Sequence, residues 1–328
     1  MREVLSTLDK WHKDGRQFAL ATVVRTRGSA PREVGSVMGV RDDGLICGSV
    51  SGGCIEGAVI EACLDALKAG DARELKFPRG SDEVGLMCGG HVDVWVDPGH
   101  ASRDWDELVS LVSSDLGCVL ATRMNPFAQT LRRPDDAACC SPLDSAVQQA
   151  FENRRSQIVD VAGEEWFMHV LVPRPRLVII GAVHIARALI VFAKEVGFVT
   201  VVIDPRTAFA QDVRFDVQPD SMVADWPQEA LAQLGLNEDT YAVALTHDPK
   251  IDDAAIEIFL NSNVAYVGAL GSKTTQEKRR AALREKGLSE EQLARIHGPV
   301  GLDIEAETPE EIALAVMAEI VKVRRARG

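Results

Sequence analysis

Residues 176–186 read RLVIIGAVHIA, and this stretch decides the fold of the second half of the chain. A short apolar run ends at Gly181, and the apolar positions after it have the spacing of a helix that begins near Ile185. A buried strand that enters a helix through a glycine turn is the opening unit of a doubly wound α/β domain. The stretch therefore predicts a parallel sheet.

The same pattern recurs along the chain after Gly181. Apolar runs at VTVVID, YAVALTH and VAYVGALG alternate with helical segments, so residues 177–328 resemble a Rossmann-like domain. Asp204 ends the second strand, where dinucleotide-binding domains place a ribose-binding carboxylate. Val183, however, stands where the G-x-G-x-x-G fingerprint has its second glycine, and its branched side chain obstructs a pyrophosphate. We therefore expect the fold to be retained and NAD(P) to bind weakly.

The first half is predicted to be a separate α+β domain over residues 1–172. QFALATVVRT at 17–26 has the composition of a buried strand, and Asp42-Asp43-Gly44 is typical of a hairpin turn. A helix with three-and-four apolar spacing begins near Ile55 and ends at Gly70. The prolines of VPRPR at 172–176 cannot join a central ladder, which predicts a linker there.

Composition excludes several classes of function. The chain has 328 residues, 46% hydrophobic, and a net charge of −13, which disfavours nucleic acid and anionic membranes as partners. No signal sequence or apolar run of about 18 residues is present, so a cytoplasmic location is expected. Seven cysteines lie outside any CxxC or zinc-finger spacing, which predicts neither a disulfide framework nor a structural zinc site.

Two cysteines are placed beside glycine pairs. In GSVSGGCIEG (48–57), Cys54 follows Gly52-Gly53 just ahead of a helix, where backbone N–H groups and the helix dipole favour an anion and a thiolate. The alternative is that Cys54 is a small packing residue. Cys88 in GLMCGGH precedes Gly89 and Gly90 in a similar way. We predict that the two thiols approach one another.

Five motifs resemble the XdhC/CoxI family: GSAPREVGSVMGV, GSVSGGCIEGAV, GLMCGG, GALGSKTTQEKRR and HGPVGLDIEAETPEEIALAVMAEIV. The family consists of accessory factors that bind molybdenum cofactor, protect it and help to insert it into enzymes of the xanthine dehydrogenase or carbon monoxide dehydrogenase type. This chain departs from it twice. GAVHIA stands where the family usually reads G-A-G-H-V-G, and Glu305 stands where it usually has glycine.

The resemblance implies a site for molybdenum cofactor, as molybdopterin or its dinucleotide form. Thiolates are soft ligands, so Cys54 and Cys88 are candidates to contact molybdenum or its sulfur. Other candidates would bind phosphate or pterin through backbone N–H groups, hydroxyls or charges. The complete set of predicted cofactor-binding residues is Arg32, Ser49, Ser51, Gly52, Gly53, Cys54, Cys88, Gly89, Gly90, Gly181, His184, Asp204, His247, Gly268 and Lys273.

The leading functional hypothesis is a cofactor chaperone without catalytic residues. Its implied partners are a molybdenum hydroxylase such as xanthine dehydrogenase, a cysteine desulfurase, and a second copy of the chain in a homodimer. Two alternatives stay open. One is an NAD(P)-dependent oxidoreductase that uses the Rossmann-like domain and Asp204, and the other is a thiol enzyme that handles sulfur or metal with Cys54 as nucleophile.

Overall fold

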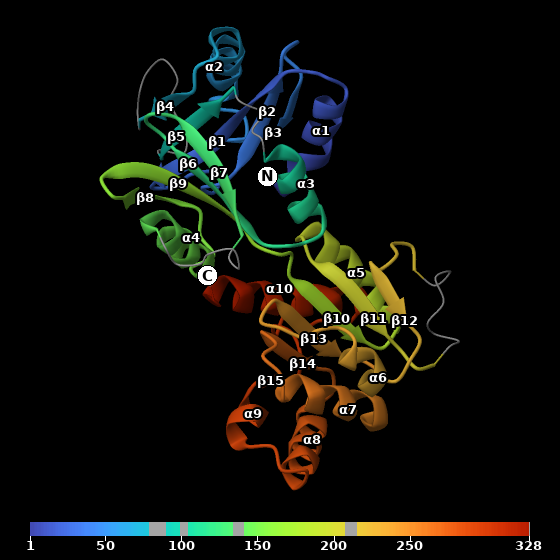
Figure 1. The fold of residues 1–328 in the computed structure, drawn as a ribbon. Helices are drawn as coiled ribbons and strands as arrows, with labels where there is room; N and C mark the ends of the chain where they lie inside the picture. The colour runs from blue at the N-terminus through green and yellow to red at the C-terminus, as the bar shows by residue number, and fades with distance from the viewer. Residues whose placement is uncertain (79–89, 99–103, 134–140, 207–214, 328) are drawn as a thin grey trace. The chain divides into compact units, whose positions relative to one another are not determined.

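A computed structural model describes residues 1–78, 90–98, 104–133, 141–206 and 215–327. The chain forms two compact units, Met1–Pro173 and Arg174–Gly328, which are drawn in Figure 1. Cys88 and Gly89 lie outside the described residues. Among the helices that are described, none is both long and apolar enough to cross a membrane.

The C-terminal unit is built on a six-stranded sheet whose neighbouring strands all pair in parallel, in the order β12-β11-β10-β13-β14-β15. The prediction of a doubly wound parallel sheet is confirmed. Strand order reverses between β10 and β13, which makes their carboxyl ends the topological switch point. The strands are β10 (Arg176–Ile180), β11 (Val199–Ile203), β12 (Ser221–Val223), β13 (Thr240–Ala244), β14 (Tyr266–Ala269) and β15 (Ile296–His297).

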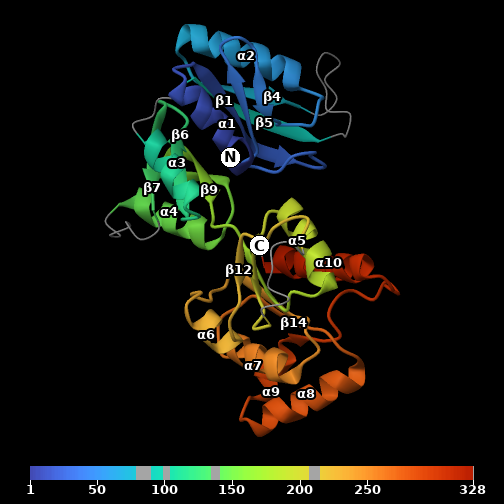
Figure 2. The same cartoon turned by 90° about the vertical axis from the view of Figure 1, so that its right-hand side faces the viewer.

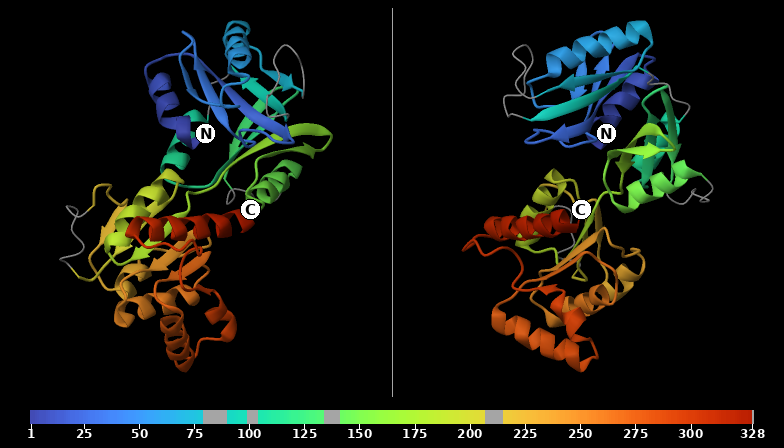
Figure 3. Two further views of the ribbon diagram at one scale, coloured as in Figure 1. Left: turned by 180° about the vertical axis from the view of Figure 1, so that it is seen from behind. Right: turned by 90° about the vertical axis from the view of Figure 1, so that its left-hand side faces the viewer.

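Helices bury both faces of this sheet. Leu177 and Ile179 of β10 pack with α5 and α10, which lie side by side, whereas Val178 and Ile180 face the opposite cluster formed with α6 to α9 (Figures 2 and 3). Burial on both faces explains the continuous apolar runs in the sequence. The helices are α5 (His184–Glu195), α6 (Pro227–Ala232), α7 (Pro249–Leu260), α8 (Lys273–Glu285), α9 (Glu290–Ala294) and α10 (Pro309–Arg327).

The start of α10 shows how local sequence sets an element boundary. Thr308 Oγ1 accepts a hydrogen bond from Glu311 N at 3.2 Å, and Glu311 Oε2 accepts one from Thr308 N at 3.0 Å. This reciprocal cap, with Pro309 as the first helical residue, matches the TPEE motif. Just upstream, Glu305 has φ +57°, a left-handed conformation that favours glycine. The backbone conformation at this position therefore explains why the family usually has glycine there.

The N-terminal unit contains a five-stranded antiparallel sheet in the order β3-β2-β1-β5-β4. Helix α2 (Glu56–Ala69) covers one face of this sheet (Figure 2). Ala19, Ala21 and Val23 of β1 pack on that side, while Phe18 and Leu20 pack with α1 (Arg2–Lys13) and α3 (Trp105–Ser113). Contacts on both faces explain why the first seven residues of the strand, 18–24, are all buried. The strands are β1 (Phe18–Arg27), β2 (Val37–Arg41), β3 (Ile46–Gly48), β4 (Arg73–Phe77) and β5 (His91–Asp97).

A four-stranded antiparallel sheet in the order β7-β6-β9-β8 completes this unit, with α4 (Pro142–Glu152) packed on it. β7 carries no strand signal in the sequence. Only Leu131 of β7 is buried, so no apolar alternation marks this edge strand. The strands are β6 (Cys118–Arg123), β7 (Ala128–Arg132), β8 (Gln157–Val161) and β9 (Glu164–Leu171).

Candidate functional site

The glycine loop, residues 49–55, connects β3 to α2 and wraps around the carboxylate of Glu56. Oε1 of Glu56 accepts hydrogen bonds from Ser49 Oγ (2.8 Å), Ser51 N (3.0 Å) and Gly52 N (2.9 Å). Oε2 accepts from Ser51 Oγ (2.5 Å) and Gly53 N (2.8 Å). The anion that these donors bind is therefore a side chain of the protein itself.

The structure changes the interpretation of the glycine pair. Gly52 and Gly53 have φ of +81° and +127°, and a Cβ added to either would meet no atom within 4 Å. Glycine is thus required at both positions for the backbone conformation. Sequence analysis missed Glu56, whose signal was an acidic residue in the first turn of the predicted helix.

The glycine loop contains an ionised carboxylate, Glu56, and is connected to α1 through Arg32. Burial raises the pKa of Glu56, but hydrogen bonds from Ser51 and Ser49 outweigh this effect and lower the pKa to about 2. Arg32 donates from Nε to the carbonyl oxygen of Ser49 (3.3 Å) and pairs through Nη2 with Glu3 of α1 (3.0 Å). Arg32 therefore links the loop to α1, in addition to its predicted role as an anion ligand.

Cys54 is held by this loop with its side chain exposed. Its backbone N–H donates to Ser51 Oγ at 3.1 Å, and Ser51 is itself 2% exposed. An exposed thiol does not fill the core, so the packing interpretation of Cys54 is wrong. Cys63 and Cys118 are buried, as expected of core cysteines, and Cys47 is half-buried.

We expect Cys54 to react with iodoacetamide at least about tenfold faster than the other described cysteines at pH 8. Burial raises the pKa of Cys63 to about 12 and that of Cys118 to about 11, so their thiolate fractions are small and their sulfurs inaccessible. Peptide mass spectrometry after timed alkylation of the folded protein measures the rates. Labelling of Cys63 or Cys118 at the rate of Cys54 would contradict the arrangement.

The second predicted thiol site lies mostly outside the described residues. Of Cys88, Gly89 and Gly90, only Gly90 is described; it is buried, and an added Cβ would collide with the carbonyl oxygen of Ser29. Gly90 therefore allows the chain just before β5 to pack closely against the segment that follows β1. The approach of Cys88 to Cys54 stays a prediction.

In the C-terminal unit, predicted residues meet at the switch point. Gly181 has φ +106°, and a Cβ there would lie 2.6 Å from Cγ2 of Thr246 in the turn after β13. Asp204 at the end of β11 accepts a hydrogen bond from Ala182 N at 2.8 Å. The turns after three neighbouring strands, β11, β10 and β13, therefore lie together at one edge of the sheet.

Asp204 differs from the ribose ligand that the sequence predicts. It is fully buried, and Arg206 donates to it from Nε (2.8 Å) and Nη2 (2.7 Å). Burial raises the pKa of Asp204, but the hydrogen bonds from Arg206 and Ala182 outweigh it and leave the pKa below the ordinary value. With both oxygens engaged, this carboxylate cannot take ribose hydroxyls without losing Arg206 or Ala182.

Titration with NAD is accordingly expected to give a Kd of about 100 µM or weaker, a binding free energy no stronger than about −5.5 kcal/mol. Val183 lies at the N-terminal cap of α5 and packs partly into the core, where the fingerprint would have glycine. Isothermal titration calorimetry on the full chain measures the affinity. A submicromolar Kd would show that neither Val183 nor the pairing of Asp204 hinders the dinucleotide.

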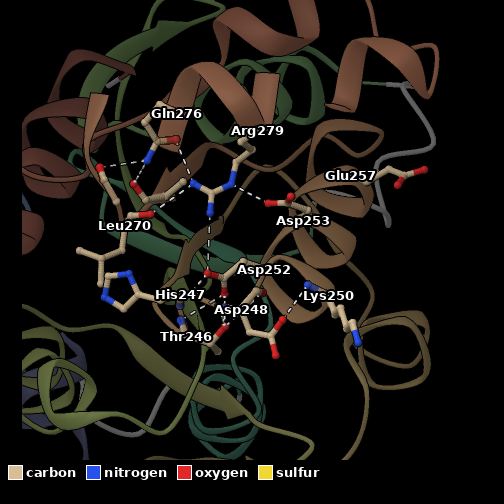
Figure 4. A network of polar contacts seen from close by, with 12 residues as sticks. Thr246, His247, Asp248, Lys250, Asp252, Asp253, Glu257, Leu270, Gln276 and Arg279 are labelled. Carbon is tan, nitrogen blue, oxygen red and sulfur yellow. Dashed lines mark hydrogen bonds and ion pairs between the residues drawn. The ribbon is translucent and has the colours of Figure 1, made fainter. Parts of the chain in front are cut away.

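His247 is presented at the switch point by a strained turn. Its φ is +62°, a region that non-glycine residues occupy at a cost of about 1–3 kcal/mol, and its side chain is exposed. Asp252 of α7 accepts hydrogen bonds from His247 N (3.0 Å), Thr246 N (3.1 Å) and Thr246 Oγ1 (2.8 Å). Figure 4 shows this carboxylate between the turn and the guanidinium of Arg279. Asp252 therefore holds the conformation that projects His247 from the sheet edge.

The network continues into α8 through Arg279, which is 5% exposed. Its guanidinium lies 3.8 Å from Asp252, donates to Asp253 (2.6 Å) and to Gln276 Oε1 (2.9 Å), and reaches the carbonyl of Leu270 (3.2 Å), as drawn in Figure 4. Two carboxylates, a carbonyl and an amide thus surround one buried cation. Sequence analysis missed this support, because the partners come from three separate segments.

The remaining predicted residues are dispersed. His184 and Lys273 are exposed first residues of α5 and α8. Gly268 is buried within β14, where an added Cβ would lie 2.6 Å from Val300 and 2.8 Å from Tyr266, so its lack of a side chain serves packing. Over the described ranges, no three His, Cys, Asp or Glu side chains gather as a metal site.

Comparison with known proteins places both units in one family. The family described as "XdhC and CoxI family" matches residues 11–78, which include the glycine loop. The description "XdhC Rossmann domain" matches residues 177–320. A solved structure described as a xanthine dehydrogenase from Bacillus halodurans has the same fold, with a TM-score of 0.79 at 23% identity over 99% of this chain and 96% of that one.

Three curated relatives extend across nearly the whole chain. YqeB of Escherichia coli is 29% identical over 94% of this chain, which spans 43% of the length of YqeB. The molybdenum cofactor insertion chaperone PaoD of Escherichia coli is 29% identical over 94% of this chain and 84% of its own length. A probable xanthine dehydrogenase subunit of Bacillus subtilis is 26% identical over 97% of this chain and 96% of its own length. The chain belongs to the XdhC and CoxI family.

Proposed function

We propose that this protein binds molybdenum cofactor and assists its insertion into a molybdenum hydroxylase of the xanthine dehydrogenase type. The relatives support this role, since one is named a molybdenum cofactor insertion chaperone and another a probable xanthine dehydrogenase subunit. The observation that carries the proposal is the exposed thiol of Cys54 on a loop that Glu56 fixes with five hydrogen bonds.

The geometry suits a carrier that must hold and release a soft centre. A thiolate is a soft donor, and a loop that is ordered before binding loses little conformational entropy when the cargo arrives. Because Glu56 takes the loop N–H groups, the phosphate of the cofactor is expected to bind elsewhere, with Arg32 as a candidate. Cys88, Gly89 and Gly90 remain proposed parts of the site.

Finer features of the role are proposals of the same kind. The protein would protect the cofactor, use its dinucleotide form and deliver it to an enzyme of the carbon monoxide dehydrogenase type. A cysteine desulfurase would supply sulfur. The protein itself would be a homodimer located in the cytoplasm. The thiol-enzyme alternative shares the exposed Cys54 and differs by predicting turnover of a sulfur or metal substrate. The pairing of Asp204 with Arg206 weighs against the NAD(P)-dependent oxidoreductase.

The test of the proposal compares wild type, Cys54→Ser and the control Cys47→Ala. After expression in molybdenum-replete cells, we expect Cys54→Ser to retain at least about tenfold less cofactor than wild type, which corresponds to about 1.4 kcal/mol. Cofactor is measured as its fluorescent oxidation product, and delivery as activation of a cofactor-free xanthine dehydrogenase. Retention by Cys54→Ser equal to that of wild type would remove the thiol from the site, and no retention by wild type would refute the chaperone role.

A further inference from the structure

A second polar cluster lies in the C-terminal unit, on the α5 and α10 side of the sheet. Glu319 of α10 accepts hydrogen bonds from the hydroxyl of Tyr266 in β14 and from Gly301 N (2.9 Å). His297, the last residue of β15, places Nδ1 at 3.1 Å from the other oxygen of Glu319. One carboxylate therefore joins β14, β15 and the segment that leads to α10.

The carboxylate determines which nitrogen of His297 carries the proton. Burial raises the pKa of Glu319, but the contacts with His297, Tyr266 and Gly301 lower it to about 2, so the group is ionised at neutral pH. An ionised carboxylate only accepts hydrogen bonds, which makes Nδ1 the donor. In the neutral imidazole, Nε2 is then an acceptor with a free lone pair.

The ring that carries this nitrogen is held in position and is partly exposed. The ring of His297 packs on that of Tyr266, with centroids 4.5 Å apart, and Tyr266 is 1% exposed. The side chain of His297 is 35% exposed, and no residue in the described part of the chain bonds to its Nε2. The buried ring of Tyr266 and the partly buried carboxylate of Glu319 thus orient an imidazole of which one nitrogen has no partner among the described residues.

We propose that His297 is the hydrogen-bond acceptor of a ligand site beside β14 and β15, and that it takes an uncharged N–H group of a heterocycle. Glu319 and Tyr266 are its positioning residues. For the neutral form of the imidazole, the class of ligand follows from the tautomer: a phosphate or carboxylate anion has no proton to offer to its Nε2, whereas a lactam or carboxamide does. Carboxyl ends of strands in doubly wound sheets are where such ligands bind.

Two sources supply this chemistry: the lactam of a pterin and the carboxamide of a nicotinamide dinucleotide. The probes are therefore neopterin and NADH, each titrated into the full chain while the ring resonances of His297 are followed by NMR. We expect one of them to shift these resonances saturably. That probe identifies the source, and the result does not depend on whether the protein retains molybdenum cofactor in cells.

The matched variant is His297→Asn, whose amide N–H takes the place of Nδ1–H and keeps Glu319 partnered while Nε2 is lost. We expect it to bind the active probe about tenfold more weakly than wild type, whereas Glu290→Gln, on an exposed ion pair of the same unit, binds like wild type. For the positioning role, Glu319→Gln should increase the Nε2–H tautomer seen in nitrogen-15 spectra.

Three outcomes would overturn the proposal. The first is that neither probe shifts the His297 resonances at millimolar concentration. The second is that His297→Asn binds the active probe as tightly as wild type. The third is that wild type carries its proton on Nε2, which would leave no acceptor for an N–H group. If His297→Asn fails to fold, the wild-type titration and its tautomer still decide the matter.

Discussion

Replacing Glu56 with alanine is expected to lower the free energy of unfolding by about 2–3 kcal/mol and to abolish cofactor retention. The substitution removes the acceptor for five hydrogen bonds from Ser49, Ser51, Gly52 and Gly53. A hydrogen bond to a charged group contributes about 1.5–3 kcal/mol. The total loss is smaller than five such contributions, because the exposed N–H groups of the glycines bond to water in the variant. Chemical denaturation measures the loss.

The same carboxylate sets a pH dependence. Its pKa is about 2 in the folded protein against an ordinary value of 4.5, because hydrogen bonds from Ser51 and Ser49 outweigh burial. A lowered folded-state pKa stabilises the protein above pH 4.5, and this stabilisation is lost as the pH falls from 4.5 towards 2. After allowance for solvent screening, the loss is expected to be about 2 kcal/mol.

Glu61→Gln is the control for both measurements, since Glu61 lies on the exposed face of the same helix. We expect it to change the free energy of unfolding by less than about 0.5 kcal/mol. A second variant, Glu56→Gln, removes the charge and keeps the shape of the side chain. Its difference from wild type in free energy of unfolding should shrink below pH 4.5, because protonation removes the charge from the wild-type side chain alone. A difference independent of pH would mean that Glu56 is not ionised in the loop.

Asp252→Ala is expected to have the largest effect on stability, a loss of about 3–5 kcal/mol, which is typical when one partner of a buried charged network is removed. Asp252 is fully buried and supports Thr246 and His247, while the nearly buried Arg279 lies 3.8 Å away. Without the carboxylate, two backbone N–H groups and a hydroxyl lose their acceptor. His247 then loses the hydrogen bond that supports its left-handed backbone.

Glu257→Gln is the matched control on the same helix. Its carboxylate pairs with Lys286 at 2.6 Å on the surface, so its loss should cost less than about 1 kcal/mol. Thermal and denaturant unfolding of the full chain compare the two variants. If Asp252→Ala unfolds like the control, Asp253 alone satisfies Arg279 and the turn at His247 is held by other contacts.

Local patterns in the sequence were enough for the architecture of the C-terminal unit. Strands of the parallel sheet are buried on both faces, and so they stand out as continuous apolar runs between helices. Glycine and the TPEE motif marked helix ends because capping depends on residues within one turn. β12 and β15 were missed, since two or three residues are too short to show a period.

The sequence by itself also identified Cys54 and the glycine loop as a candidate site, but not what the loop binds. Backbone N–H groups donate to any nearby anion. In this loop the anion is the carboxylate of Glu56, the first residue of α2, so these N–H groups are already bonded within the protein. The same competition applies to Asp204, whose position after β11 fits a ribose ligand but whose oxygens are taken by Arg206 and Ala182. Residue type and spacing do not reveal such internal partners.

Only the tertiary structure decided which side chains act together. Asp252 and Arg279 are 27 residues apart, and His297 and Glu319 are 22 apart, on elements that meet through packing of helices on the sheet. Periodicity is a property of neighbouring residues along the chain. A hydrogen bond instead depends on which acceptor the folded chain places within reach of a donor. For that reason the sequence determined the fold and the family, while the orientation of His247 and the open nitrogen of His297 emerged only from the folded chain.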